Sequence, residues 1–213
     1  FVGYLPNAET VEPDTKLGLD DMFELVRKAD EDYRTLQEKK EKLKQKIEEY
    51  RAKQQIVAPF RPLECDLHRV LHYRYITYRF GRIAVEFYHK MQKYLMDDLK
   101  AIFVEGERDE SYVYGVYFVS QAETQKVDAV FRSLHFERIE LKDEFEGTPD
   151  TAYRVLENEI ARVNLEIEDL DKQAGEMLAD RAPQLVAAKH RLEELSNNFD
   201  VRKLAARMED KQE

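Results

Sequence analysis

Three side chains that can bind metal ions lie close together in the stretch CDLHRVLH (65–72). Cys65, His68 and His72 offer one thiol and two imidazoles, and two histidines four residues apart on a helix can share one ion. The stretch leads into a segment rich in Tyr, Arg and Ile that predicts a β-strand, and a strand would separate the histidines. No fourth ligand follows nearby, so we expect neither a metal site nor a metal cofactor.

Arginines alternate with aromatic residues in the segment HYRYITYRFGRI (72–83). Such alternation is typical of nucleic-acid surfaces, where bases stack on aromatic rings and cationic side chains contact phosphates. The whole chain has a formal net charge of −10, which repels a polyanion. The segment can therefore be an RNA-binding strand or an ordinary core strand.

Patterns for enzyme chemistry are missing from the sequence. No Gly-x-Gly or Gly-Lys-Ser spacing predicts a phosphate-binding loop, and one Cys with scattered His residues is not a nucleophile constellation. Carboxylates alternate with lysines along helical segments, as on a solvated face. We expect no catalytic residues and no cofactor.

The single cysteine excludes an internal disulfide framework and fits a reducing compartment. No run of about twenty apolar residues predicts a membrane span. The chain begins with Phe1 rather than Met, which predicts that it is a piece of a longer protein.

Residues 19–58 predict one long helix, because they contain no Gly or Pro and are rich in Glu and Lys. Core positions recur at alternating spacings of four and three residues, as in the seam of a coiled coil. A helix this polar needs a partner helix. The expected seam positions are Met22, Val26, Ala29, Tyr33, Leu36, Lys40, Leu43, Ile47, Tyr50 and Gln54.

Residues 148–213 predict the partner helix, with Thr148 as its N-cap and Pro149 at its first position. Two long helices separated by a compact insert must run antiparallel if they pair. Pro183, near a slip in the register, predicts a kink or a break. The expected seam positions are Leu156, Ile160, Val163, Ile167, Leu170, Ala174 and Met177, and after the slip Leu185, Ala188, Leu192, Leu195 and Phe199.

The insert, residues 59–147, predicts the order strand, helix, strand, strand, helix, strand, which is the ferredoxin-like plan. We expect Gly81 to form the turn into the first helix, and Ser120 and Glu123 to form a capping box on the second. The expected elements are strand 71–80, helix 83–96, strands 100–107 and 111–119, helix 120–134 and strand 136–141.

The predicted fold class is therefore α+β, a long antiparallel coiled-coil hairpin carrying a ferredoxin-like βαββαβ lobe at its tip. Residues 1–18 predict a linker or the remnant of another lobe. An RNA-binding RRM module has the same element order and aromatic residues on its first and third strands. The third strand here lacks the Lys/Arg-Gly start of the RRM signature, but an RRM-like module stays the alternative.

Three motifs carry a resemblance to a known family: RFGRI (79–83), FRSLHFERIEL (131–141) and EGTPDTAYRVLENEIARVNLEIEDL (146–170). In their order and spacing they resemble the cytoplasmic N-terminal region of subunit I of bacterial and archaeal V-type ATPases, the homologue of the eukaryotic "a" subunit. The resemblance covers residues 20–210. Ala84 departs from the Pro that many members have there, which affects only the start of the helix.

The resemblance implies a distal lobe at the end of a coiled coil, on the cytoplasmic face of a membrane. It implies a non-catalytic stator arm that keeps the membrane half-channel static during ATP-coupled transport of H⁺ or Na⁺. The implied partners are the E and G subunits of the peripheral stalk and other ATPase subunits near the membrane, and no nucleic acid. The predicted docking residues are Glu86, His89 and Lys93 on the first helix of the lobe, together with Arg74 and Arg79, two arginines that acidic stalk helices could pair with.

Overall fold

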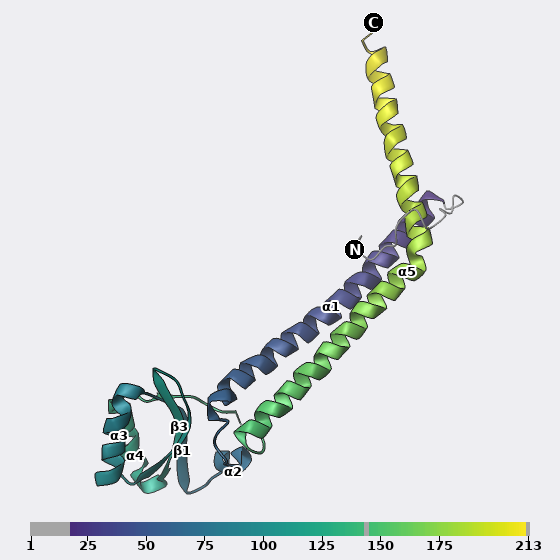
Figure 1. Cartoon of the computed structure of the whole chain (residues 1–213). Coiled ribbons are helices and arrows are strands. Elements are labelled where there is room, and N and C mark those ends of the chain that lie inside the picture. Colours follow the sequence, from purple (N-terminus) through teal and green to yellow (C-terminus); the bar gives the residue numbers. More distant parts are fainter. Residues whose placement is uncertain (1–17, 143–144, 212–213) are drawn as a thin grey trace. The chain divides into compact units, whose positions relative to one another are not determined.

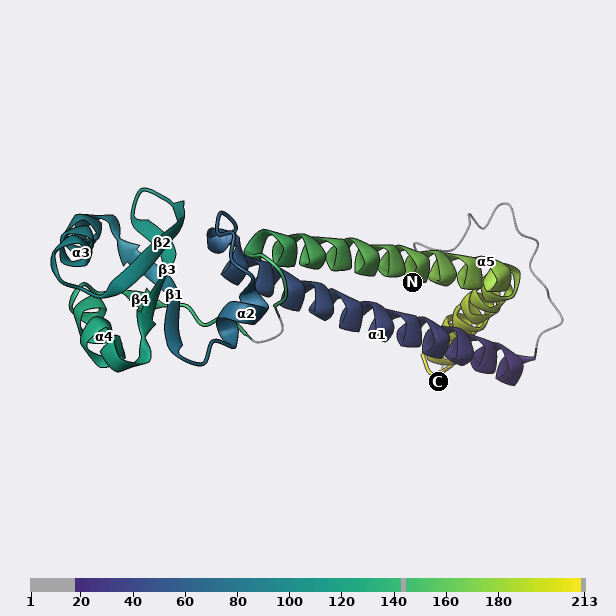
Figure 2. The ribbon, with the colours of Figure 1, turned by 90° about the horizontal axis from the view of Figure 1, so that it is seen from below.

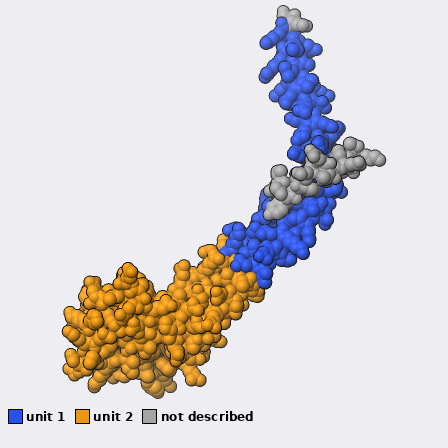
Figure 3. All heavy atoms as spheres, in the orientation of Figure 1, with its two compact units in different colours: residues 1–44, 164–213 blue, residues 45–163 orange. Residues whose placement is uncertain are grey.

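The computed structural model describes residues 18–142 and 145–211, in two compact units (Figures 1 and 3). Unit 1 contains residues 18–44 and 164–211 of the described chain, and unit 2 contains residues 45–163. A long N-terminal helix and a four-stranded antiparallel sheet confirm the α+β class. Residues 1–17 of the predicted linker lie outside the described residues. The elements are α1 (Leu19–Val57), η3 (Ala58–Phe60), α2 (Leu67–Leu71), β1 (Ile76–Ala84), α3 (Val85–Asp97), β2 (Ala101–Arg108), β3 (Tyr112–Ser120), η4 (Gln121–Glu123), α4 (Thr124–Ser133), β4 (Glu137–Arg138) and α5 (Pro149–Glu209).

In unit 1, the first part of α1 packs against α5 through an apolar seam. Ala29 and Leu178 are fully buried there, and Leu185 completes the cluster. Lys40, a polar residue at a predicted core position, places its Nζ 2.7 Å from Asp171 Oδ1. Its charge is therefore paired at the rim of the seam. All ten predicted seam positions of α1 are buried or half-buried.

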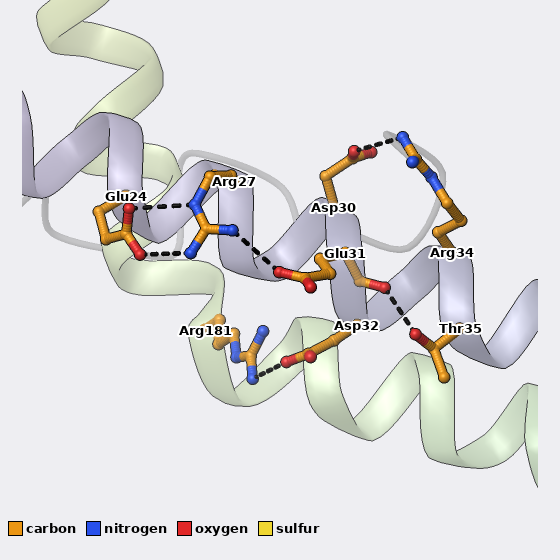
Figure 4. Close-up of polar contacts among 8 residues, drawn as sticks. All are labelled: Glu24, Arg27, Asp30, Glu31, Asp32, Arg34, Thr35 and Arg181. Atoms are coloured by element: carbon orange, nitrogen blue, oxygen red, sulfur yellow. Dashed lines mark hydrogen bonds and ion pairs between the residues drawn. The ribbon is translucent and has the colours of Figure 1, made fainter.

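Ion pairs give the direction of the two helices in unit 1. Arg181 Nη2 lies 2.6 Å from Asp32 Oδ2 (Figure 4), and Lys40 pairs with Asp171 further along α1. Since the partner number on α5 falls as the number on α1 rises, the two segments run antiparallel. The other pairs in Figure 4, such as Arg27 with Glu24, lie within α1 on an exposed face and contribute little to stability.

The last part of α5 corrects one prediction. Leu192 and Leu195 are 36% exposed and Phe199 is 59% exposed, so the seam does not continue as a buried contact within the described residues. The reason is that the described part of α1 begins at Leu19, and no further described element faces this part of α5.

Pro183 lies inside α5 without ending it, and Figure 1 shows α5 changing direction in this region.

Unit 2 is built around the sheet, whose strand order is β2-β3-β1-β4 with every neighbouring pair antiparallel. Helices α3 and α4 lie on one face of the sheet and α2 lies on the other (Figures 1 and 2). The central pair β1 and β3 is in register from Ile76 opposite Ser120 to Ala84 opposite Tyr112. Period-two alternation along these strands sends successive side chains to opposite faces.

A separate hydrophobic core lies on each face of the sheet. On one face, Ile83, Val113 and Tyr117 pack against apolar residues of α3 and α4. On the other face, Phe80 and Val116 pack against η3, α2 and the ends of the long helices that belong to unit 2. The central strand β3 is thus covered on both sides, which explains its nearly continuous run of apolar and aromatic residues.

The first strand was predicted to start at Leu71, and this prediction was wrong. Residues 67–71 form α2, because Asp66 accepts a hydrogen bond from the Arg69 amide at 3.1 Å and Leu67 and Val70 are buried. The strand begins only at Ile76 and continues to Ala84.

Gly81 also differs from its prediction, since it lies inside β1, opposite Gly115, and forms no turn. A Cβ at Gly81 would lie 2.5 Å from Phe136 Cζ and would also meet the Glu137 carbonyl. The glycine is therefore required by the close approach of β4 and the Phe136 ring.

Two further boundaries differ from the predictions. Ser120 and Glu123 form no capping box, because residues 121–123 form the 3-10 turn η4 and the Thr124 hydroxyl donates to the Ser120 carbonyl at 3.1 Å. The predicted strand 136–141 pairs only at Glu137 and Arg138.

The predicted N-cap of α5 is confirmed, since the Thr151 amide donates to Thr148 Oγ1 at 3.1 Å.

Candidate functional site

A groove in unit 2 contains two of the five predicted docking residues. It has a volume of about 700 Å³ and runs beside β1 from Ile76 to Phe80. Three arginines and one glutamate give it an excess of positive charge in a chain whose net charge is −10. The lining residues are Tyr73, Arg74, Ile76, Thr77, Tyr78, Arg79, Phe80, Gln121, Arg138, Ile139, Glu140 and Leu141.

A buried carboxylate holds two of the arginines that line the groove. Asp128 on α4 is 9% exposed, and its Oδ2 lies 3.3 Å from Arg79 Nη2 and 3.1 Å from Arg138 Nη2. Its Oδ1 accepts a hydrogen bond from the Tyr117 hydroxyl at 2.6 Å. One carboxylate therefore fixes two arginines, from β1 and β4, and a tyrosine from β3.

The electrostatics of this cluster favour the charged carboxylate. Burial alone would raise the pKa of Asp128, but the hydrogen bonds from Tyr117 and Arg79 and the charges of both arginines hold that pKa below its usual range. Burial and the hydrogen bond to Asp128 raise the pKa of Tyr117 well above its usual range. At neutral pH one negative charge thus faces two positive charges, and the excess is positive.

Not all of the donors in the groove are used. Arg79 Nε is buried and makes no hydrogen bond within the described part of the chain. Arg138 is half exposed, with 49% of its side chain accessible, so it can meet a partner from solvent. Arg74 is exposed, and its guanidinium lies 5.5 Å from the centre of the Tyr75 ring. Arg74 and Arg138, which solvent reaches, can therefore bind carboxylates of a partner.

The other three predicted docking residues lie on a different element. Glu86, His89 and Lys93 are exposed on α3, spaced by three and four residues on one helical face. Within the described residues, no hydrogen bond or ion pair joins them to Arg74 or Arg79. The five residues therefore form two candidate patches, one at the groove and one on α3.

Sequence reasoning missed Asp128 and Arg138. A signal for Asp128 was present, because it is the one charged residue among the apolar positions of VDAVF (127–131) on a predicted amphipathic helix. A buried carboxylate needs a cationic partner, and the arginines of the two neighbouring strands were the available ones. The predicted ferredoxin-like plan sets β4 beside β1 but does not fix their register, so the contact of Arg138 with Asp128 could not be derived.

The secondary structure around the candidate metal ligands differs from the prediction. His68 lies on α2 and His72 ends it, so no strand separates them, and their ring centroids are 4.5 Å apart. His72 Nδ1 lies 2.7 Å from the His68 carbonyl oxygen. Among residues 18–142 and 145–211, no group of three or more His, Cys, Asp or Glu side chains is arranged to hold a metal ion.

The aromatic residues of the sheet mostly fill cores. Tyr78, Tyr114 and Phe118 pack against the core on the face opposite α3 and α4, where an RRM would present its rings to RNA. Tyr117 is buried on the other face. The RNA-binding alternative is therefore not supported. None of the described helices is long and apolar enough to cross a bilayer.

Comparisons with known proteins give one type of match. No protein-family model and no curated protein matches the sequence. Among solved structures, the crystal structure of the cytoplasmic N-terminal domain of subunit I, the homologue of subunit a, of V-ATPase is similar, with a TM-score of 0.53 and 12% sequence identity. The match covers 89% of this chain, which spans 64% of the length of that one. This chain has the fold of the cytoplasmic N-terminal domain of V-ATPase subunit I, the resemblance that its sequence motifs predicted.

Proposed function

We propose that this chain is the cytoplasmic arm of a V-ATPase subunit I, a non-catalytic part of the stator. The observation that carries this proposal is the shared fold over 89% of the chain. The three sequence motifs, which extend from β1 into α5, add independent support. In this role the chain acts on the cytoplasmic face of the membrane and takes part in transport of H⁺ or Na⁺ without binding a cofactor.

The proposed architecture is a long antiparallel coiled-coil hairpin with a ferredoxin-like lobe at its tip. The seam of alternating three- and four-residue spacings on α1 supports the coiled coil, and the strand order β2-β3-β1-β4 supports the ferredoxin-like lobe. Its proposed parts are a linker or lobe remnant (1–18), an outgoing helix (19–58), the lobe (59–147) and a return helix (148–213).

This architecture suits a protein that must resist torque. A rotary ATPase pumps ions only if the membrane half-channel does not turn with the rotor, so the stator must transmit force to the peripheral stalk. Paired helices resist bending better than one helix. A lobe covered on both faces of its sheet gives a rigid docking surface.

The proposed partners are the E and G subunits of the peripheral stalk, together with other ATPase subunits near the membrane. The groove beside β1 supports this docking through charge, because Arg74, Arg79 and Arg138 offer cations to acidic helices. The α3 patch of Glu86, His89 and Lys93 is a second candidate contact.

The test is a pull-down of the full chain with a purified E–G heterodimer, with a structured RNA as the competing ligand. We expect retention of the stalk and none of the RNA. Arg74→Glu is the preferred variant, because Arg74 is exposed and the fold does not depend on it, whereas a change at Arg79 would also disturb Asp128. We expect Arg74→Glu to weaken binding at least about fivefold, the effect of about 1 kcal/mol from one lost charge pair.

The matched control is Arg51→Glu, which makes the same charge change on the exposed face of α1 within unit 2. It should bind the stalk like the wild type. Equal affinities of Arg74→Glu and Arg51→Glu would exclude the groove as the docking site. Salt-sensitive capture of RNA without capture of the stalk would overturn the stator function.

A further inference from the structure

The last part of α5 carries an apolar stripe that continues the buried seam of unit 1. Leu185 and Ala188 are 6% and 0% exposed, where they lie in or beside the cluster with α1. The same spacing continues to Leu192, Leu195 and Phe199, which are 36%, 36% and 59% exposed. The helix itself extends to Glu209. A stripe that is built like the seam thus loses its cover over the following helical turns.

The charged residues that border this stripe are all basic. With Leu192 and Phe199 at position a of the heptad, Leu195 and Arg202 take position d. The e and g positions that flank the stripe between 189 and 205 contain only basic or uncharged residues: Lys189, Arg191, Ser196, Asn198, Lys203 and Ala205.

The acidic residues lie away from the stripe. Glu193, Glu194 and Asp200 occupy positions b and c, on the outer side of the helix. Glu194 Oε2 lies 3.2 Å from Arg191 Nη1, but both side chains are exposed, where such a pair is weak and can exchange for another carboxylate. Lys203 stays on the side of the stripe, since its Nζ lies 4.9 Å from the centre of the Phe199 ring. This segment therefore presents an apolar row with cationic borders, within an acidic chain.

The charge pattern decides which occupant fits. A second copy of this segment, parallel or antiparallel, would bring basic or uncharged flanks against one another and would place Arg202 in the seam of both helices. An amphipathic helix with acidic e and g positions would instead form an ion pair at each basic border and offer a carboxylate to Arg202. Complementary flanks select partner and orientation in coiled coils.

We propose that residues 189–206 of α5 bind an amphipathic helix of a separate protein, with apolar a and d positions and acidic flanks. The bound helix would cover Leu192, Leu195 and Phe199. This surface belongs to unit 1, whereas the docking groove belongs to unit 2. The inference rests on α5 alone and does not depend on the proposed stator function.

The test uses two synthetic peptides and the full chain. Both peptides are about four heptads long, with Leu at a and d; one has Glu at every e and g position and the other has Lys. Fluorescence anisotropy with labelled peptides measures their affinities. We expect the acidic peptide to bind at least tenfold more tightly than the basic peptide, with an affinity that falls as salt is added.

Variants of the chain locate the binding face. Phe199→Glu should abolish binding of the acidic peptide, because it places a carboxylate in the apolar row. Val201→Glu is the matched control: Val201 is also exposed, at 64%, but lies on the other side of the helix, and this variant should bind like the wild type. Circular dichroism checks that both variants keep their helix content.

Three results would overturn the proposal. The first is equal affinity for the acidic and basic peptides, and the second is unchanged binding by Phe199→Glu. The third is a dimer of the chain in sedimentation velocity that Phe199→Glu dissociates, since that result would make a second copy the occupant. Stalk binding through the groove would be unaffected by any of these outcomes.

Discussion

Replacing Asp128 with alanine removes the acceptor that three side chains of the lobe share. Tyr117 Oη lies 2.6 Å from one carboxylate oxygen, and Arg79 and Arg138 lie 3.3 and 3.1 Å from the other. The substitution leaves the three donors in place without their partner. It therefore measures what the carboxylate contributes to the folding of unit 2.

The three contacts contribute unequally because their burial differs. Tyr117 is 1% exposed, so its hydroxyl would lose its acceptor without gaining water, at a cost of about 1–3 kcal/mol. The side chains of Arg79 and Arg138 are 30% and 49% exposed and can be rehydrated, so each adds only about 0–1 kcal/mol. We expect Asp128→Ala to lower the free energy of unfolding by about 3 kcal/mol.

A double-mutant cycle with Tyr117→Phe isolates the buried contact. Removing the hydroxyl first removes the group that Asp128→Ala would leave unsatisfied, so the double variant should lose about 1–2 kcal/mol less than the sum of the singles. Urea unfolding followed by tyrosine fluorescence suits this chain, which has twelve Tyr and no Trp. Asp97→Ala, at an exposed position of α3, is the control.

Either of two results would refute this reasoning. A loss below about 1 kcal/mol for Asp128→Ala would mean that water or another donor replaces the carboxylate. Additive losses in the cycle would mean that Tyr117 and Asp128 contribute to stability independently. The control should change the unfolding free energy by less than about 0.5 kcal/mol.

Three further predictions concern stability. Gly81→Ala should destabilise unit 2 by about 3 kcal/mol or more in the same urea assay, because the added methyl group overlaps the Phe136 ring; a loss under 1 kcal/mol would contradict the close approach of β4. The pKa of Asp128 is lower in the folded state than in the unfolded chain, where it is about 4, so ionised Asp128 stabilises the fold fully above about pH 4. This stabilisation is lost as pH falls through the lower folded-state pKa. The unfolding free energies of the wild type and Asp128→Asn, measured as a function of pH, should therefore converge below that pKa. Thr148→Ala should cost about 1 kcal/mol through loss of the N-cap bond to the Thr151 amide, and Thr148→Ser should restore it.

The helices were predictable from the sequence because their signals are local. The first helix ends at Val57 and the last starts at Pro149, next to the predicted boundaries, since the composition changes at Pro59 and Thr148 caps the return helix. The exposure of Leu192, Leu195 and Phe199 was not predictable, because the spacing of apolar residues reports a face that can be buried and not whether a partner covers it.

The candidate site was only partly predictable, because it joins strands that are distant in the sequence. Arg74 and Arg79 were identified from their residue types, and the structure places both at one groove. The predicted ferredoxin-like plan sets β4 beside β1, but the contact of Arg138 with Asp128 depends on the register and on tertiary packing, which leave no local pattern. Gly81 was interpreted as a turn residue because glycine favours turns, whereas its lack of a side chain serves packing.

The opposed glycines of β1 and β3 also limit how the sheet can assemble during folding. Gly81 faces Gly115, and the rings of Phe136 and Phe103 occupy the space that their missing side chains leave. If β1 slipped by one residue against β3, Phe80 or Arg82 would stand opposite Gly115 and the side chains of β1 would exchange faces. Only one alignment of the two central strands lets both rings close over the sheet. The glycine pair therefore selects the strand register, a role in which neither residue can be replaced by a larger one.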